Sequence, residues 1–465
     1  MTVSAAPEPT TARPGPSVAS RAPPPRQART PAGAFIGGAK GRLLPAHIPL
    51  RYFGAAVVYH LLAWLALAAG AAQWTEFGGG LGWPLASLHL ITLGVLGMSV
   101  LGAGAQLLPV ASRQAVTGWP LLTAIWWLYT PGVALLALGM GLARAPLVGA
   151  GALATTVALL AWAWVTGRNL RGARGMPGVV GHGWAALAAL LLMLAAALAL
   201  VAVWLGWPAP PRGTVLALHR VMAPYGFIGM LTLGLSYVLV PMFVLSDTPE
   251  ERHQRVSLAL LVLALVLAAL ATLGLARAWL LPAGLLAATA AVGLHLWLMA
   301  QAIRQGMRPL AGASGMLVRL GWCGLLGSLA VAWLVASGRP PPRAGLWFGL
   351  CLVGVWQLSF LLGMLQRIAP FLAAMHDGGG RRARTPSALT HEGALRLHCA
   401  CHCAALLLLA IAITSGNRWV TLVAAGLGAA GAAAFGVFFA ALVRRLRQGT
   451  ATPRPPAPMR HGQPS

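Results

Sequence analysis

The sequence is poor in charged residues and poorer still in acidic ones. Of its 465 residues, 9% are charged and seven are Asp or Glu, whereas 58% are hydrophobic and the mean hydropathy is +0.76. A water-soluble fold of this length does not need that balance, and apolar runs of about 20 residues are long enough to cross a membrane as helices. The scarcity of charge therefore excludes a soluble domain and predicts a polytopic membrane protein.

Other absences narrow the fold class. The apolar runs do not alternate with polar residues, which argues against a transmembrane β-barrel and leaves helices as the spanning structure. The five cysteines lie in or beside apolar runs, so a disulfide framework is not indicated. The net charge of +26 comes from arginines in loops and tails, where they orient helices. We therefore expect the lipid bilayer, and no nucleic acid, as a partner.

Twelve apolar runs predict an all-α protein with twelve transmembrane helices. Their approximate limits are 50–73, 84–110, 117–142, 146–167, 182–206, 214–245, 256–277, 279–302, 315–337, 344–372, 391–415 and 419–443. The segments 1–46 and 448–465 are rich in Pro and Arg, which predicts disordered tails beside a membrane domain over 47–447.

Loop charges predict the orientation of the helices. Arginine clusters follow spans 4, 8 and 12, at 167–175, 304–309 and 444–449, whereas most of the opposite loops carry about one arginine each. Because loops rich in Lys and Arg stay in the cytoplasm, both termini are expected on the cytoplasmic side of a bacterial inner membrane.

Spans 2, 6 and 10 share a spacing of glycine and proline. When they are aligned on one proline each, a glycine stands seven positions earlier in every copy. The prolines are Pro109, Pro241 and Pro370, and the glycines are Gly102, Gly234 and Gly363. Glycine lets helix backbones approach closely in a membrane, so we expect these three helices to be central.

The period of this pattern predicts a repeat unit of four helices. The three prolines are separated by 132 and 129 positions. The membrane domain is therefore interpreted as three pseudo-symmetric units of four helices, over about 47–175, 176–309 and 310–447.

Histidines open the first two copies of the pattern. Given the rise per residue of an α-helix, His89 and His219 should lie ~7 Å inside the outer boundary of the membrane. A histidine inside a span is costly and is a functional hypothesis by default. His60 and His295 lie in mid-span, where either a functional role or a single interhelical hydrogen bond would explain them.

The eleventh span carries a dense group of histidines and cysteines. His391, His398 and His402 fall on one helix face, and the last two are one turn apart, a spacing that lets two imidazoles share a metal ion. Cys399 and Cys403 are also one turn apart, on an adjacent face. Thiolate with imidazole would favour Cu(I) or Zn(II). The alternative is that the cysteines are small packing residues in an Ala-rich helix.

Two motifs carry a resemblance to a known family. The segments His89–Val110 and Gly226–Phe243 resemble subunit I of the heme-copper oxidase superfamily, and more closely its bacterial twelve-helix relatives; the NnrS family is similar more loosely. The resemblance covers about 48–447 and implies twelve helices in three four-helix arcs. It also implies that His89 matches a low-spin heme ligand and that His219 stands near the position of a copper ligand.

The chain departs from the oxidase pattern at the catalytic positions. The proline and glutamate expected after His219 are absent, because Arg220 and Val221 follow it, and 256–277 contains no histidine. The tenth span has Gln357 and Ser359 where His-x-His is expected. The copper and high-spin heme ligand sets are therefore missing, and we do not expect the protein to reduce dioxygen.

The sequence leaves three functions open. The first is binding of b-type heme, copper or both, in respiratory redox or in nitric oxide or metal homeostasis, with a redox partner protein. The candidate cofactor ligands are His89, His219, His398 and His402, and the candidate metal ligands are His398, His402, Cys399 and Cys403. The alternatives are a membrane transporter and a cofactor-free assembly or structural subunit.

Overall fold

A computed structural model of the chain describes residues 1–4, 42–115, 118–376 and 384–450. The described residues form helices joined by short loops, and they contain no strand. Twelve of the helices are long and apolar enough to cross a membrane, which confirms the predicted all-helical, twelve-span fold. The predicted tails, 1–46 and 448–465, lie mostly outside the described residues.

Nine of the described spans are single α-helices. They are α2 His47–Ala69, α6 Trp119–Gly141, α7 Ala145–Arg171, α8 Pro177–Trp204, α11 Glu251–Thr272, α12 Arg277–Gln305, α13 Gly312–Ala336, α17 Glu392–Ser415 and α18 Arg418–Thr450. Two short helices, α3 Ala71–Trp74 and α16 Pro386–Leu389, lie in loops. Span 7 begins five residues before its predicted limit of 256, because its polar first turn continues the helix beyond the apolar run.

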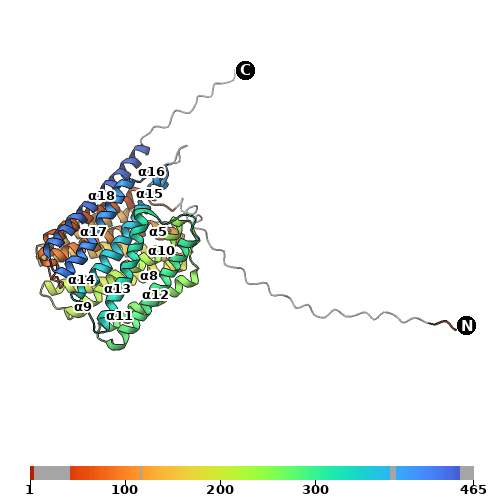
Figure 1. Cartoon of the computed structure of the whole chain (residues 1–465), viewed down its shortest axis with the longest axis horizontal. Helices are drawn as coiled ribbons and strands as arrows, with labels where there is room; N and C mark the ends of the chain where they lie inside the picture. Colours follow the sequence, from red (N-terminus) through yellow and green to blue (C-terminus); the bar gives the residue numbers. More distant parts are fainter. Residues whose placement is uncertain (5–41, 116–117, 377–383, 451–465) are drawn as a thin grey trace, which may run out of the picture.

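The remaining three spans are the second, sixth and tenth, and each contains a π-helical segment between two α-helices. They are α4 Trp83–His89, η1 Leu90–Gly97 and α5 Met98–Ser112; α9 Arg212–Val221, η2 Met222–Gly229 and α10 Met230–Val244; and α14 Ala344–Gly349, η3 Leu350–Leu358 and α15 Ser359–His376. In Figure 1 the labels α5, α10 and α15 lie toward one end of the bundle, and α9 and α14 lie toward the other.

Spans 2, 6 and 10 form the centre of the bundle, as the glycine pattern predicts. Their most apolar windows are 72%, 89% and 67% buried, whereas none of the other nine spans exceeds 50%. The π-helical segments meet there, because η3 contacts both η1 and η2. The outer helices have more lipid-facing surface, which suits their Ala-rich and Leu-rich composition.

The repeated glycines allow each central helix to lie against the first helix of its own unit. A Cβ on Gly102 would come within 2.8 Å of the Tyr52 side chain in α2. A Cβ on Gly234 would come within 2.5 Å of the His182 side chain in α8, and one on Gly363 within 2.9 Å of the Ser314 carbonyl oxygen in α13. The glycines are therefore packing residues, in agreement with their role in other membrane helices.

Each π-helical segment has a backbone carbonyl that accepts a side-chain hydrogen bond. The Tyr129 hydroxyl donates to Leu93 O in η1 (3.1 Å), and the Gln357 amide donates to Pro224 O in η2 (2.6 Å). The Ser359 hydroxyl donates to Gly354 O in η3 (3.2 Å). Backbone groups freed from a regular helix need such partners inside a membrane.

Helix pairing also recurs with a period of four. The pairs with the most extensive contacts are α6 with α7, α11 with α12, and α17 with α18, which are the third and fourth helices of the three predicted units. The rotation that would superpose the units stays a prediction.

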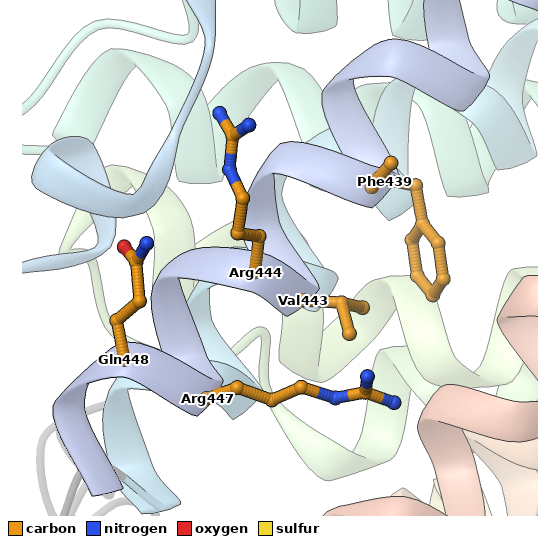
Figure 2. Close-up of a pocket in the computed structure, with 6 residues that line it drawn as sticks. Phe439, Val443, Arg444, Arg447 and Gln448 are labelled. Carbon is orange, nitrogen blue, oxygen red and sulfur yellow. The ribbon is translucent and has the colours of Figure 1, made fainter. Parts of the chain in front are cut away.

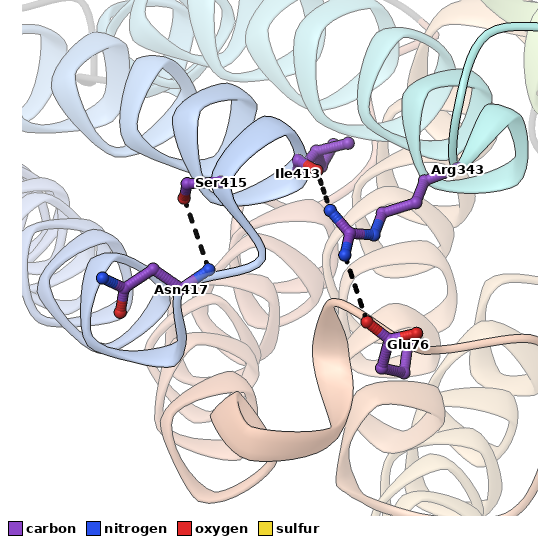
Figure 3. A network of polar contacts seen from close by, with 5 residues as sticks. All are labelled: Glu76, Arg343, Ile413, Ser415 and Asn417. Atoms are coloured by element: carbon purple, nitrogen blue, oxygen red, sulfur yellow. Dashed lines mark hydrogen bonds and ion pairs between the residues drawn. The ribbon is translucent and has the colours of Figure 1, made fainter.

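The first and last units meet and close the bundle. Helix α2 packs along α18. Near one end, Arg343 donates to the Ile413 carbonyl oxygen (2.6 Å) and to the Glu76 carboxylate (3.2 Å), so a loop of the first unit is tied to two segments of the third (Figure 3).

Candidate cofactor site

The structure brings His89 and His219 together. His89 is the last residue of α4, directly before η1, and His219 lies in α9, three residues before η2. Their ring centroids are 6.5 Å apart and their planes differ by 15°. Both rings are half-buried. Two histidines separated by about 130 residues in the sequence thus lie together, each just before the π-helical segment of a central span.

The hydrogen bonds of this pair fix the tautomer of each ring. His89 Nδ1 lies 3.0 Å from Leu85 O, and His219 Nδ1 lies 3.4 Å from Met193 O. A carbonyl oxygen can only accept, so each Nδ1 carries the proton of its neutral ring. Both Nε2 atoms therefore present lone pairs. Histidine ligands of metals commonly have this arrangement, with the second nitrogen bonded to a carbonyl.

Two arginines of α9 lie near the loop before α4: Arg212 begins the helix, and Arg220 directly follows His219 in its last turn. Arg212 donates a hydrogen bond to Gly79 O in the loop before α4. A Cβ on Gly79 would lie 3.3 Å from Arg220 Nη2 and 3.8 Å from Arg212 Nη2. The two guanidinium groups therefore converge on this loop, and both side chains are exposed. They form a positively charged patch at this loop, and Arg220 connects the patch to His219, its neighbour in the sequence.

The histidines of the eleventh span lie in a second, fully buried cluster. The His398 and His402 ring centroids are 5.7 Å apart, and His60 of α2 joins them at 5.9 Å from His398. Their relative exposures are 0%, 1% and 1%. His391, predicted on the same face, instead caps the N-terminus of α17 by accepting a hydrogen bond from Ala394 N. The cluster thus contains His60 from another helix and does not contain His391.

The structure separates the cysteines from these imidazoles. Cys399 Sγ lies 3.8 Å from Ala313 O, at the start of α13. His398 points to α18 instead, with Nδ1 3.0 Å from Gly431 O. Cys399 and Cys403 lie one turn apart on the α13 side. The four candidate metal ligands of the eleventh span therefore fall into two pairs on different faces.

A third group of buried histidines was not predicted as a site from the sequence. Tyr237 of α10 lies between His182 of α8 and His295 of α12, with ring centroid distances of 5.6 Å and 5.2 Å. The Tyr237 hydroxyl donates to Ser257 Oγ in α11 (2.9 Å). This group links four helices of the second unit. The mid-span position of His295 was its only signal in the sequence.

The positions that depart from the oxidase pattern have structural partners. Gln357 donates to η2, as described above. Ser359 Oγ lies 2.9 Å from His402 Nε2 and also donates to Gly354 O. These side chains bond the central helices to each other and to α17.

An open groove of about 540 Å³ runs along the C-terminal part of α18 (Figure 2). It is lined by Phe439, Ala440, Val443, Arg444, Arg447 and Gln448. Apolar side chains at one end and arginines at the other suit the boundary between lipid chains and headgroups. None of the candidate ligands lines it.

Within the described part of the chain, no group of three or more His, Cys, Asp or Glu side chains is arranged to hold a metal ion. The candidate ligands come as pairs instead.

No protein-family model matches the sequence, and no curated protein matches it significantly.

Proposed function

We propose that the protein is a bacterial inner-membrane protein that binds b-type heme through His89 and His219. The observation that carries this proposal is the facing pair of imidazoles, each with its Nδ1 proton on a carbonyl and its Nε2 lone pair free. Heme supplies four nitrogen ligands of its own, so a pair of imidazoles is sufficient to complete its coordination.

The distance between the rings suits this pairing, and the stacked rings would turn so that both Nε2 atoms reach the same metal ion. A metal–nitrogen bond of about 2 Å on each side, added to the half-width of two imidazoles, separates the ring centroids by roughly 6 Å. The observed separation is 6.5 Å. The resemblance of His89–Val110 to the second helix of heme-copper oxidases supports the same residue.

The charge beside the pair also suits heme. Heme carries two carboxylates, and guanidinium groups are the strongest carboxylate partners among side chains. Arg212 and Arg220 converge on the loop before α4, and Arg220 directly follows His219. In this proposal the arginines hold the polar edge of the macrocycle toward water, while the apolar helices cover the rest.

When bound, heme would supply a one-electron redox centre. His89 and His219 would hold the group, and their Nδ1 bonds to Leu85 O and Met193 O would keep the rings oriented. This arrangement favours transfer of electrons to or from a redox partner protein over binding of a diatomic substrate. Dioxygen reduction has no support from Gln357 and Ser359, which replace the expected ligands.

The test is the heme content of the purified protein. We expect extractable b-type heme in the wild type, and at least about a tenfold loss in His89→Ala and His219→Ala, because each removes a proposed ligand. Arg220→Gln should lower heme retention by a few-fold. The matched control is His295→Ala, another buried span histidine, which should retain the wild-type content. Equal heme in all four variants, or none in the wild type, would contradict the proposal.

The orientation is part of the same proposal. Both termini are placed in the cytoplasm on the basis of the arginine-rich loops. Reporter fusions after Gly79 and after Gly378 should then report outside and inside, respectively. Reporters on the same side would contradict this topology.

A further inference from the structure

A second candidate site lies in the fully buried histidine cluster, and it is independent of the heme proposal. His398 and His402 come from α17 and His60 from α2. Each of the three rings has one nitrogen with no hydrogen-bond partner: His398 Nε2, His402 Nδ1 and His60 Nδ1. Unpartnered polar atoms in a protein interior are costly and point to an unassigned partner.

The partner atoms show which of these nitrogens carry lone pairs. His398 Nδ1 is bonded to Gly431 O, so it holds the proton and Nε2 is the lone pair. Ser359 uses its own proton for Gly354 O, so its oxygen accepts from His402 Nε2–H. The lone pair of His402 is therefore on Nδ1. Two buried lone pairs thus stand on successive turns of one helix.

His60 differs from the other two rings. The Trp64 indole N–H can only donate, and it lies 3.1 Å from His60 Nε2. His60 Nε2 is therefore the acceptor, and the proton of the neutral ring is on Nδ1. This nitrogen presents a hydrogen rather than a lone pair. His60 is thus a neighbour of the site and not a third ligand.

The surroundings limit the charge of any bound ion. The cluster contacts the rings of Trp64 and Phe435, and the Phe435 ring centroid is 5.0 Å from that of His398. Both ligands are neutral imidazoles. The cost of burying an ion rises steeply with its charge, so a monovalent ion is favoured over a divalent one. Cu(I) combines a single charge with affinity for imidazole and tolerance of two ligands.

We propose that His398 Nε2 and His402 Nδ1 bind one Cu(I) ion in the interior of the bundle. The site uses imidazoles alone, because the Cys399 and Cys403 side chains lie on the α13 side of the helix. Ser359 acts as a positioning residue that holds His402 in the ligating tautomer. No electron transfer is part of this proposal.

The experiment is an anaerobic titration of the detergent-purified full chain with Cu(I), in competition with a chromophoric Cu(I) chelator. Thiols bind Cu(I) on their own, so the titration uses a background in which Cys323, Cys351, Cys399, Cys401 and Cys403 are all Ser. We expect one Cu(I) per chain in that background. His398→Ala and His402→Ala should each weaken binding by at least about 100-fold.

Three comparisons make the result decisive. His60→Leu should retain Cu(I), and its loss there would overturn the two-ligand assignment. His182→Ala, a matched buried histidine outside the cluster, should also retain it. Zn(II) should bind far more weakly than Cu(I), and equal binding would overturn the argument from charge. Absence of Cu(I) binding in the cysteine-free background would overturn the site itself. Heme content, measured on the same samples, should not change, which separates this site from the proposed heme site.

Discussion

The two histidine sites differ in depth, and this difference indicates what each can hold. The His89/His219 pair is half-buried at one end of the central helices, and Arg220, which directly follows His219, is exposed and joins Arg212 at the loop before α4. The His398/His402 pair is fully buried, with aromatic rings and backbone carbonyls as neighbours. A large group with anionic substituents can reach polar partners only at the first site. A small ion of low charge suits the second.

Both sites depend on the π-helical segments, but in different ways. His89 directly precedes η1 and His219 lies three residues before η2, so the widened turns set the direction of the rings. His402 is held by Ser359, the residue that follows η3. The three segments thus orient the ligands of one site and a positioning residue of the other. Changes in single segments should therefore affect one site at a time.

The largest effect is expected from deleting Ile91. Loss of one residue would convert η1 toward a regular α-helix and rotate His89 by about 100° relative to the rest of the span. His89 would then no longer face His219. We expect loss of nearly all heme, with Cu(I) binding retained. Retention of wild-type heme would show that the π-helical segment does not orient His89.

Substitution of Gly324, which packs against η3, should have the next largest effect, and this effect is on the stability of the protein. A Cβ on Gly324 of α13 would lie 2.3 Å from Trp356 N in η3, so the backbone must move. We expect Gly324→Ala to destabilise the protein by about 1–3 kcal/mol, as overpacking does in other proteins. The measurement is thermal unfolding in detergent micelles.

The control for this substitution is Gly293→Ala. Gly293 also lies within a spanning helix, but no atom lies within 4 Å of its Cβ position. Ala is the better helix former, so stability should stay the same or rise slightly. An equal loss of stability in both variants would contradict the packing argument.

Ser359→Ala should have a moderate effect confined to the buried pair. The substitution removes the hydrogen bond to His402 Nε2 and leaves both proposed ligands in place. We expect Cu(I) affinity to fall by about 10-fold, within the range for partners of metal ligands. Ser359→Thr, which keeps the hydroxyl, should restore much of it. Unchanged affinity in Ser359→Ala would show that Ser359 does not position His402.

The smallest effect is expected at the loop contact between the first and third units. Arg343 and Glu76 are joined at 3.2 Å, but 76% of the Glu76 side chain is exposed. Exposed ion pairs contribute about 0–1 kcal/mol. Glu76→Gln should therefore change the unfolding temperature little and leave heme and Cu(I) unchanged. A large loss of either ligand would mean that this contact controls the sites.

Much of the fold could be predicted from composition and spacing. Lipid permits few backbone solutions, so apolar runs of sufficient length define the twelve spans. The glycines aligned on Pro109, Pro241 and Pro370 identified the central helices. The π-helical segments were not predicted, because a widened turn leaves no clear mark in a run such as Leu90–Gly97. They became visible only in the backbone of the folded chain.

The candidate sites could be predicted only in part. His89 and His219 were singled out because they open equivalent copies of one pattern. The contact of His60 with His398 depends on the rotation and packing of α2 against distant helices, which no local pattern encodes. The same holds for His182 and His295, which meet at Tyr237. The cysteines of the eleventh span appeared beside the histidines in sequence, but the neighbouring helices separate the two faces.

The most direct test of the heme proposal is a reduced-minus-oxidised optical spectrum of the purified protein and its His219→Ala variant. The account predicts a b-type heme band in the wild type, its loss in His219→Ala and its retention in His295→Ala. A wild type without any heme band, or a band that is unchanged in His219→Ala, would contradict it.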